Sequence, residues 1–113
     1  MKRQYESQQD CPIARSLDLL GDRWTILVLR DLHRGRTRFA DLLRSLEGIS
    51  PNLLSARLKS LEHEGLVERR LYCQHPPRAE YVLTECGSEF APVLRAMLDW
   101  GKAYRPAEMP AGA

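Results

Sequence analysis

The features that mark membrane proteins and disulfide scaffolds are scarce in this chain of 113 residues. No run approaches the roughly 18 apolar residues of a membrane-spanning helix, and no apolar segment follows the polar N-terminus as in a signal peptide. The three cysteines, Cys11, Cys73 and Cys86, are an odd number without framework spacing, so we expect free thiols. We therefore expect a cytoplasmic protein that makes no membrane contact.

Motifs of common catalytic and metal sites are also missing. The sequence contains no glycine-rich phosphate loop, no nucleophile elbow and no zinc-binding helix motif, and Cys11 has no obvious base near it along the chain. We therefore expect neither an enzyme nor a cofactor. Cys73-x-His75 could supply two metal ligands, but zinc sites need three or four. We predict no metal site, and a metal-responsive regulator stays open as an alternative.

Net charge is only +2, so no strong charge of one sign points to a partner. Its distribution is more informative, because residues 34–80 contain nine Arg or Lys against six Asp or Glu, whereas the rest contains eight against nine. A local excess of positive charge is consistent with a nucleic-acid partner. The margin is too small to decide the question alone.

Helical spacing, caps and turn residues predict one domain that is mainly α with a small β wing. The expected helices are 12–20, one capped by Asp22 and ended by Gly35, one from Thr37 or Arg38 to Gly48, 50–64 and 86–104. The expected strands are 66–73 and 79–83, joined at a Pro76-Pro77 corner. Residues 11–104 would form the domain, between a flexible arm at 1–10 and a flexible tail at 105–113.

Two of the expected helices are joined by about four residues that include Gly48, as a helix-turn-helix requires. Ser50 is a suitable cap for the second of them, and Pro51 suits its first position. A basic strand and a proline-cornered hairpin follow. This order is typical of a winged helix-turn-helix that binds double-stranded DNA.

The helix after Ser50 separates into two faces at about 100° per residue. Its core face holds Leu54, Leu58 and Leu61, and Arg57 lies beside this stripe, where we expect it to brace the fold. The opposite face holds small and polar side chains, which permit close approach to base edges and phosphates. The predicted DNA-reading residues are Ser50, Asn52, Ser55, Ala56 and Lys59.

Basic residues outside this helix extend the predicted DNA surface. Arg78, next to the proline corner, suits a narrow minor groove, and His75 a phosphate. Arg36 and Arg38 are candidate phosphate clamps at the start of the preceding helix. The alternative interpretation is an ordinary solvated face, on a winged helix used only for protein contacts.

The terminal helices hold more apolar surface than so small a body can cover. A second copy of the chain, packed about a two-fold axis, is the economical partner. An alternative is that both helices fold back onto their own domain. The predicted interface residues are Ile13, Leu17, Val93, Met97 and Trp100.

Together these blocks resemble the HxlR-type winged helix-turn-helix regulators of bacteria, relatives of the MarR group. The resemblance covers roughly residues 11–101 and rests on CP at 11–12, LLGDRW at 19–24, RFADL at 38–42, GISPNLLSARL at 48–58, GLV at 65–67, PPRAEY at 76–81 and LT at 83–84. It implies a homodimer held by the terminal helices, which binds a pseudo-palindromic operator and controls nearby genes, as a repressor or an activator.

Cys11 lies at the start of the first expected helix, where the helix dipole favours an anion. In some proteins of the family it resembles, a cysteine at this position senses oxidants, quinones or aldehydes. The resemblance thus implies a small reactive effector as a further partner. An inert packed thiol is the alternative, and we expect Cys73 and Cys86 to be passive.

Overall fold

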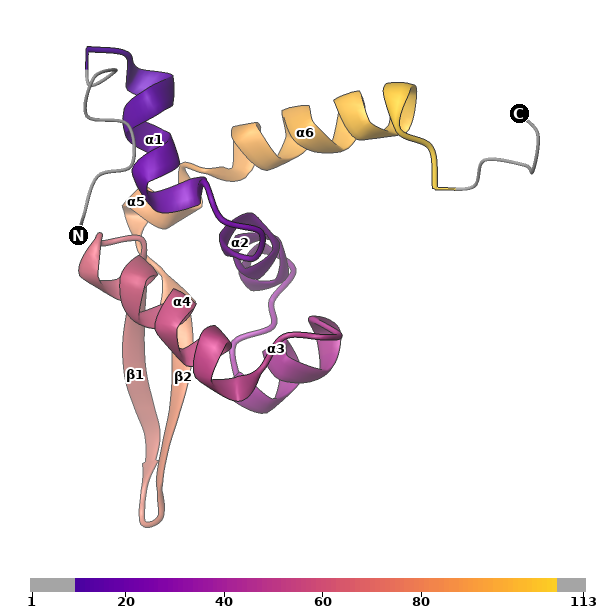
Figure 1. The fold of residues 1–113 in the computed structure, drawn as a ribbon. Coiled ribbons are helices and arrows are strands. Elements are labelled where there is room, and N and C mark those ends of the chain that lie inside the picture. Colours follow the sequence, from indigo (N-terminus) through magenta and orange to yellow (C-terminus); the bar gives the residue numbers. More distant parts are fainter. Residues whose placement is uncertain (1–9, 108–113) are drawn as a thin grey trace.

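The computed structural model describes residues 10–107 (Figure 1). Within that range the elements are α1 (Pro12–Leu20), α2 (Thr25–His33), α3 (Phe39–Ser45), α4 (Pro51–His63), β1 (Val67–Gln74), β2 (Pro77–Leu83), α5 (Glu85–Ser88) and α6 (Ala91–Tyr104). The chain is a winged helix-turn-helix, mainly α with a two-stranded wing, as the sequence predicts. The predicted flexible segments at 1–10 and 105–113 lie largely outside the described residues.

The core forms where α2, α3 and α4 meet. Leu54, Leu58 and Leu61 are completely buried, which confirms the predicted core face of α4. They pack with buried apolar side chains of α2 and α3, chiefly Val28, Leu29, Leu32, Leu42 and Leu46. Burial of so many leucines supplies most of the stabilisation of a body this small. The position of α4 is therefore fixed by its buried face.

The turn between α3 and α4 has the expected chemistry. Gly48 adopts a φ of +98°, a conformation that side-chain-bearing residues rarely take. Ser50 Oγ accepts a hydrogen bond from the Leu53 N–H at 3.1 Å, so it caps α4, and Pro51 occupies the first turn. These residues set the start of α4 relative to α3.

The helix after Asp22 begins later than the sequence suggests. It starts at Thr25, so Trp24 precedes the helix and is not part of it. The carboxylate of Asp22 still acts as the cap, because its Oδ1 accepts hydrogen bonds from the N–H groups of Trp24 (2.7 Å) and Thr25 (3.0 Å). The capping role was correctly predicted, and the boundary was wrong by two residues because the chain makes one more turn before it winds into the helix.

The single last helix predicted for residues 86–104 is wrong. The chain forms the short α5, turns at Glu89 and Phe90, and starts again as α6. Pro92 explains the break, because a proline inside a continuous helix would lack one N–H and clash with the carbonyl four residues earlier. In the first turn of α6 the same proline is well accommodated. The break sends α6 away from the body (Figure 1).

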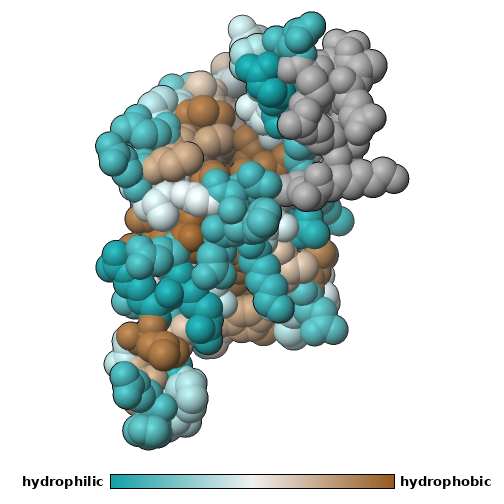
Figure 2. Space-filling view, turned by 90° about the vertical axis from the view of Figure 1, so that its left-hand side faces the viewer, coloured by the Kyte–Doolittle hydropathy of each residue, from teal (hydrophilic) through white to brown (hydrophobic). Residues whose placement is uncertain are grey.

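The wing is an antiparallel pair that pairs Val67 with Leu83 at its base and Gln74 with Pro77 at its tip. Both strands run closer to the tip than predicted, so Pro77 lies within β2 and not in the corner. A register shift between Leu71 and Cys73 twists the outer part. The wing projects from the body in two perpendicular views (Figures 1 and 2).

Among residues 10–107, none of the helices has the length and apolar content that would let it cross a membrane.

Candidate nucleic-acid interface

The predicted reading face of α4 is only partly exposed. Asn52 and Lys59 are exposed, and Ser50 is exposed as well as capping the helix. Ser55 and Ala56 are half-buried, so their short side chains lie closer to the body than the helical wheel suggests. Two long polar side chains therefore project from a low surface that a DNA groove could approach closely.

Arg57 braces the fold, as predicted. Its Nη1 lies 3.4 Å from Oδ2 of Asp22, which links α4 to the start of α2. Burial acts to raise the pKa of Asp22, but hydrogen bonds from the Thr25 hydroxyl and from the Trp24 and Thr25 N–H groups, together with the Arg57 guanidinium, hold that pKa below its ordinary value. The carboxylate is thus charged at neutral pH, and it fixes both helices.

Arg36 is not a free phosphate clamp. Its Nη1 lies 3.7 Å from Oδ1 of Asp31, a carboxylate buried completely at the end of α2. The same oxygen faces Nε of Arg30 at 3.1 Å and Nη1 of Arg34 at 4.0 Å. The Asp31 main-chain carbonyl also accepts hydrogen bonds from the N–H groups of Arg34 and Arg36. Asp31 therefore organises the loop that leads into α3.

Sequence analysis missed Asp31, although a signal was present. A single acidic residue stands in an otherwise apolar helix, with arginines one position before it and three and five positions after it. Because a buried charge needs partners, that spacing predicts an ion cluster.

Arg38 connects α3 to the wing. Its guanidinium lies 4.3 Å from the ring centroid of Tyr72, a cation–π contact, and its backbone bridges to that of Glu80. Next to it, the Thr37 carbonyl accepts a hydrogen bond from the Tyr81 N–H at 2.8 Å, and the Thr37 hydroxyl donates to Glu80. The helix-turn-helix and the wing are thus held as one unit at this point.

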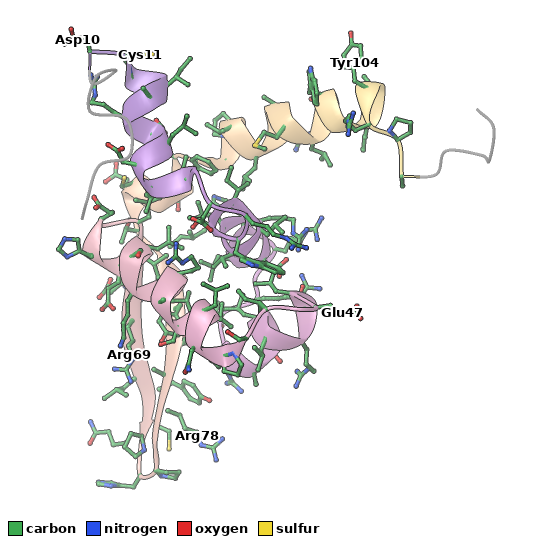
Figure 3. All side chains as sticks on the ribbon, in the orientation of Figure 1. Asp10, Cys11, Glu47, Arg69, Arg78 and Tyr104 are labelled. Carbon is green, nitrogen blue, oxygen red and sulfur yellow. The ribbon has the colours of Figure 1, made fainter. Side chains whose placement is uncertain are left out.

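Exposed basic side chains occupy the outer wing. His75 and Arg78 are exposed, and Arg78 lies close to the tip, with Arg69 higher on β1 (Figure 3). Arg70 instead pairs with Glu68 at 3.1 Å. Figure 2 also shows an apolar patch on the wing, where Leu71 is 52% exposed. The outer wing combines charge for phosphates with one apolar surface.

The cysteines lie apart from this surface. Cys11 precedes α1, is exposed and makes no side-chain capping hydrogen bond. In Figure 3 it lies at the end of the molecule opposite to Arg78. Cys73 is half-buried in β1 and Cys86 is exposed in α5. Within residues 10–107, no cluster of three or more His, Cys, Asp or Glu side chains has a geometry suited to a metal ion.

Most residues of the predicted dimer interface are exposed. Ile13 is 75% exposed and Trp100 60%, and Val93 and Met97 are about half exposed, whereas Leu17 is half-buried against its own chain. No residue of α6 is fully buried. Tyr104, which the prediction omitted, is exposed and packs its ring 5.6 Å from that of Trp100.

Comparison with known proteins gives a consistent result. Residues 19–109 match the HxlR-like helix-turn-helix family. An uncharacterized HTH-type transcriptional regulator of Synechocystis sp. is 44% identical over 100 residues, which cover 88% of this chain and 74% of that protein. YdeP of Bacillus subtilis, also an uncharacterized HTH-type transcriptional regulator, is 36% identical over 97 residues, which cover 86% and 76%.

Two solved structures of regulators superpose closely on this fold. The redox regulator HypR in its reduced form gives a TM-score of 0.78 at 34% identity, with 84% of this chain and 94% of HypR covered. The reduced form of the transcriptional regulator YodB from B. subtilis gives 0.72 at 34% identity, with 87% and 98% covered. Together with the family match, these similarities establish that the chain belongs to the HxlR-like helix-turn-helix family of transcriptional regulators.

Proposed function

We propose that this regulator binds a pseudo-palindromic DNA operator as a homodimer, with α4 in the major groove and the wing beside it. One observation carries the proposal: α4 exposes Asn52 and Lys59 while its leucine face is completely buried, and an arginine-bearing wing is fixed next to it. A helix held rigidly on one side, with polar side chains on the other, suits base reading.

Each exposed side chain has a chemically defined role in this proposal. Asn52 would form two hydrogen bonds with an adenine, and Lys59 would bind guanine or a phosphate. Arg78 would enter the minor groove, and His75 would contact a phosphate. Arg38, held by Tyr72, would approach the DNA backbone as part of the rigid connection to the wing. Arg36 would act mainly through Asp31.

The homodimer follows from the unpartnered face of α6. Val93, Met97, Trp100 and Tyr104 recur at intervals of four, three and four residues, which places them in one stripe on the helix. All four are exposed in the single chain. Packing against the same stripe of a second copy would remove this surface from water, and Ile13 would extend the contact.

Three single substitutions test the DNA surface. Asn52→Ala, Lys59→Ala and Arg78→Ala should each weaken operator binding about tenfold or more, because each removes base or phosphate contacts. Arg105→Ala, which removes a charge far from α4, is the matched control and should bind as the parent does. Fluorescence anisotropy with a labelled operator measures all four, and light scattering checks that the dimer persists. Unchanged binding in all three variants would contradict the proposed surface.

A redox response through Cys11 is the finer part of the proposal. HypR is named as a redox regulator, and Cys11 of this chain is an exposed free thiol at the start of α1. Modification of Cys11 would act on the helix that carries Ile13, and through it on the proposed dimer contact.

Thiol labelling tests this response. Iodoacetamide near neutral pH should alkylate Cys11 faster than Cys73 or Cys86, as read by mass spectrometry of quenched samples. Cys11→Ser should abolish any effect of an oxidant on operator binding. Equal alkylation rates, or an oxidant response that survives Cys11→Ser, would remove the basis for a Cys11 sensor.

A further inference from the structure

The last helix carries two separate apolar faces. At about 100° per residue, Val93, Met97, Trp100 and Tyr104 form the outward stripe, which the proposed dimer would cover. Ala91, Leu94 and Leu98 lie about 120° away around the helix axis, on the side that faces α2. A second copy on the outward stripe therefore leaves the inner face to be explained separately.

A groove separates this inner face from α2. It has a volume of about 420 Å³ and is lined by Ile26 and Leu27 of α2 and by Ala91, Leu94, Met97 and Leu98 of α6. Sites for small molecules have volumes of roughly 300–1,000 Å³ and mostly apolar walls with a few polar groups. The groove therefore has the size and lining of a small-molecule site.

The polar groups of the groove are all basic. Arg30, His33, Arg34 and Arg95 line it, and no Asp or Glu does. The nearby carboxylate is that of Asp31, which is buried and whose Oδ1 already faces three guanidiniums. Arg34 keeps a 56% exposed side chain, and Arg95 forms no ion pair within the described part of the chain. One end of an apolar groove thus has positive charge to spare.

His33 adds an unsatisfied polar group to the wall. Its Nδ1 lies 2.8 Å from the Leu29 carbonyl, which accepts the ring N–H. Its Nε2 is buried and has no hydrogen-bond partner within residues 10–107. Such a group is unfavourable unless a partner reaches it.

We propose that this groove binds a small amphipathic carboxylate. The hydrocarbon part would lie between Leu27 of α2 and Leu94 and Leu98 of α6. The carboxylate would bind Arg34 and Arg95, because a planar guanidinium pairs with a carboxylate through two parallel hydrogen bonds.

The inference rests on the proposed function for its consequence. Arg34 and Leu27 belong to the DNA-binding body, whereas Arg95 and Leu94 belong to the helix that carries the proposed dimer contact. A ligand that bridges them would favour one angle between α6 and the body. Because two bodies are joined through α6 in the proposed dimer, that angle sets the separation of the two recognition helices. The ligand would thus be an effector.

Direct binding without DNA tests the site. The probe is 4-phenylbutyrate, and 4-phenyl-1-butanol is its neutral match; isothermal titration calorimetry measures both on the full chain. The butyrate should bind once per chain, and the alcohol at least about tenfold more weakly. The double variant Arg34→Gln/Arg95→Gln should weaken butyrate binding about tenfold, while Arg105→Gln, the charge control, leaves it unchanged. Ala91→Phe, which fills the groove without removing a charge, should abolish it.

Three results would overturn the proposal: equal binding of acid and alcohol, butyrate binding that the double variant does not change, or no butyrate binding to a folded chain. The last would mean that a second copy fills the groove. Circular dichroism of each variant shows whether it is folded. Because no DNA is present, a failure here is distinguishable from a failure of operator binding.

Discussion

Asp22 shows how one residue fixes the geometry of the DNA-binding body. Its carboxylate caps the start of α2 and pairs with Arg57 of α4, so a single side chain connects the central helix to the recognition helix. Arg57 Nε is buried without a hydrogen-bond partner among residues 10–107, which leaves Asp22 as the contact that offsets its charge. Substitution at this position therefore acts on both helices.

The charge of Asp22 makes stability depend on pH. Asp22→Asn keeps the capping ability of the side chain but removes the charge, and should lower the free energy of unfolding by about 1 kcal/mol at neutral pH. Because the pKa of Asp22 is held below its ordinary value of 3.8, this contribution is fully present above that value and is lost as pH falls through the lower folded-state pKa.

Urea denaturation at a series of pH values measures the difference between Asp22→Asn and the parent, with Asp99→Asn on exposed α6 as the control. The gap for Asp22→Asn should be constant from pH 7 to about 5 and close below about pH 4. A gap that stays constant to the lowest pH would contradict an electrostatic role.

Among the elements, α5 is the most tightly constrained by its neighbours. A Cβ on Gly87 would lie 2.1 Å from the Leu66 carbonyl oxygen, an impossible contact with backbone. The same carbonyl accepts a hydrogen bond from the Thr84 N–H, and the Thr84 hydroxyl accepts one from the Gly87 N–H. The close approach places α5 against the base of the wing and sets where α6 leaves the body.

Two glycine substitutions separate this contact from helix propensity. Gly87→Ala should lower the free energy of unfolding by about 1–3 kcal/mol, because backbone must move to admit the methyl group. Gly101→Ala, inside α6 with open space around it, should raise stability by about 0.5–1 kcal/mol. Thermal denaturation of both variants checks this. Equal effects would mean that α5 does not pack against Leu66 as described.

Elements whose boundaries depend on local chemistry could be predicted from the sequence, and those that depend on distant contacts could not. The leucine stripe of α4, the Ser50 cap and the Gly48 turn were correct because periodicity and capping are local. The division into α5 and α6 was missed although Pro92 is a local signal, because the apolar stripe on both sides of it suggested one helix.

The predicted DNA surface shows the same limit. Exposure of Asn52 and Lys59 followed from the helical wheel, but the half-burial of Ser55 and Ala56 depends on how deeply α4 lies in the body. The pairing of Arg36 with Asp31 and the stacking of Arg38 on Tyr72 join segments that only the fold brings together. Charge alone could not distinguish an arginine for DNA from one for the structure.

For the molecule as a whole, α6 is an arm with an apolar outward stripe that one chain leaves exposed. Met97→Glu or Trp100→Glu places a charge in the centre of the proposed interface and should convert the dimer to a monomer at micromolar concentration. Lys102→Glu, on the opposite side of α6, should remain dimeric. Light scattering after gel filtration measures the mass. A dimer that survives both stripe substitutions would place the interface elsewhere.

Dimerisation and DNA binding meet in one measurement, the affinity of the reduced protein for the DNA just upstream of its own gene, against a shuffled fragment of equal composition, at about physiological salt. Two recognition helices fixed on a two-fold axis should give a preference of about 10³-fold or more for the natural fragment, and affinity should fall steeply as salt rises. Equal affinity for both fragments, or binding that does not respond to salt, would contradict the proposal that this fold reads a DNA sequence in that region.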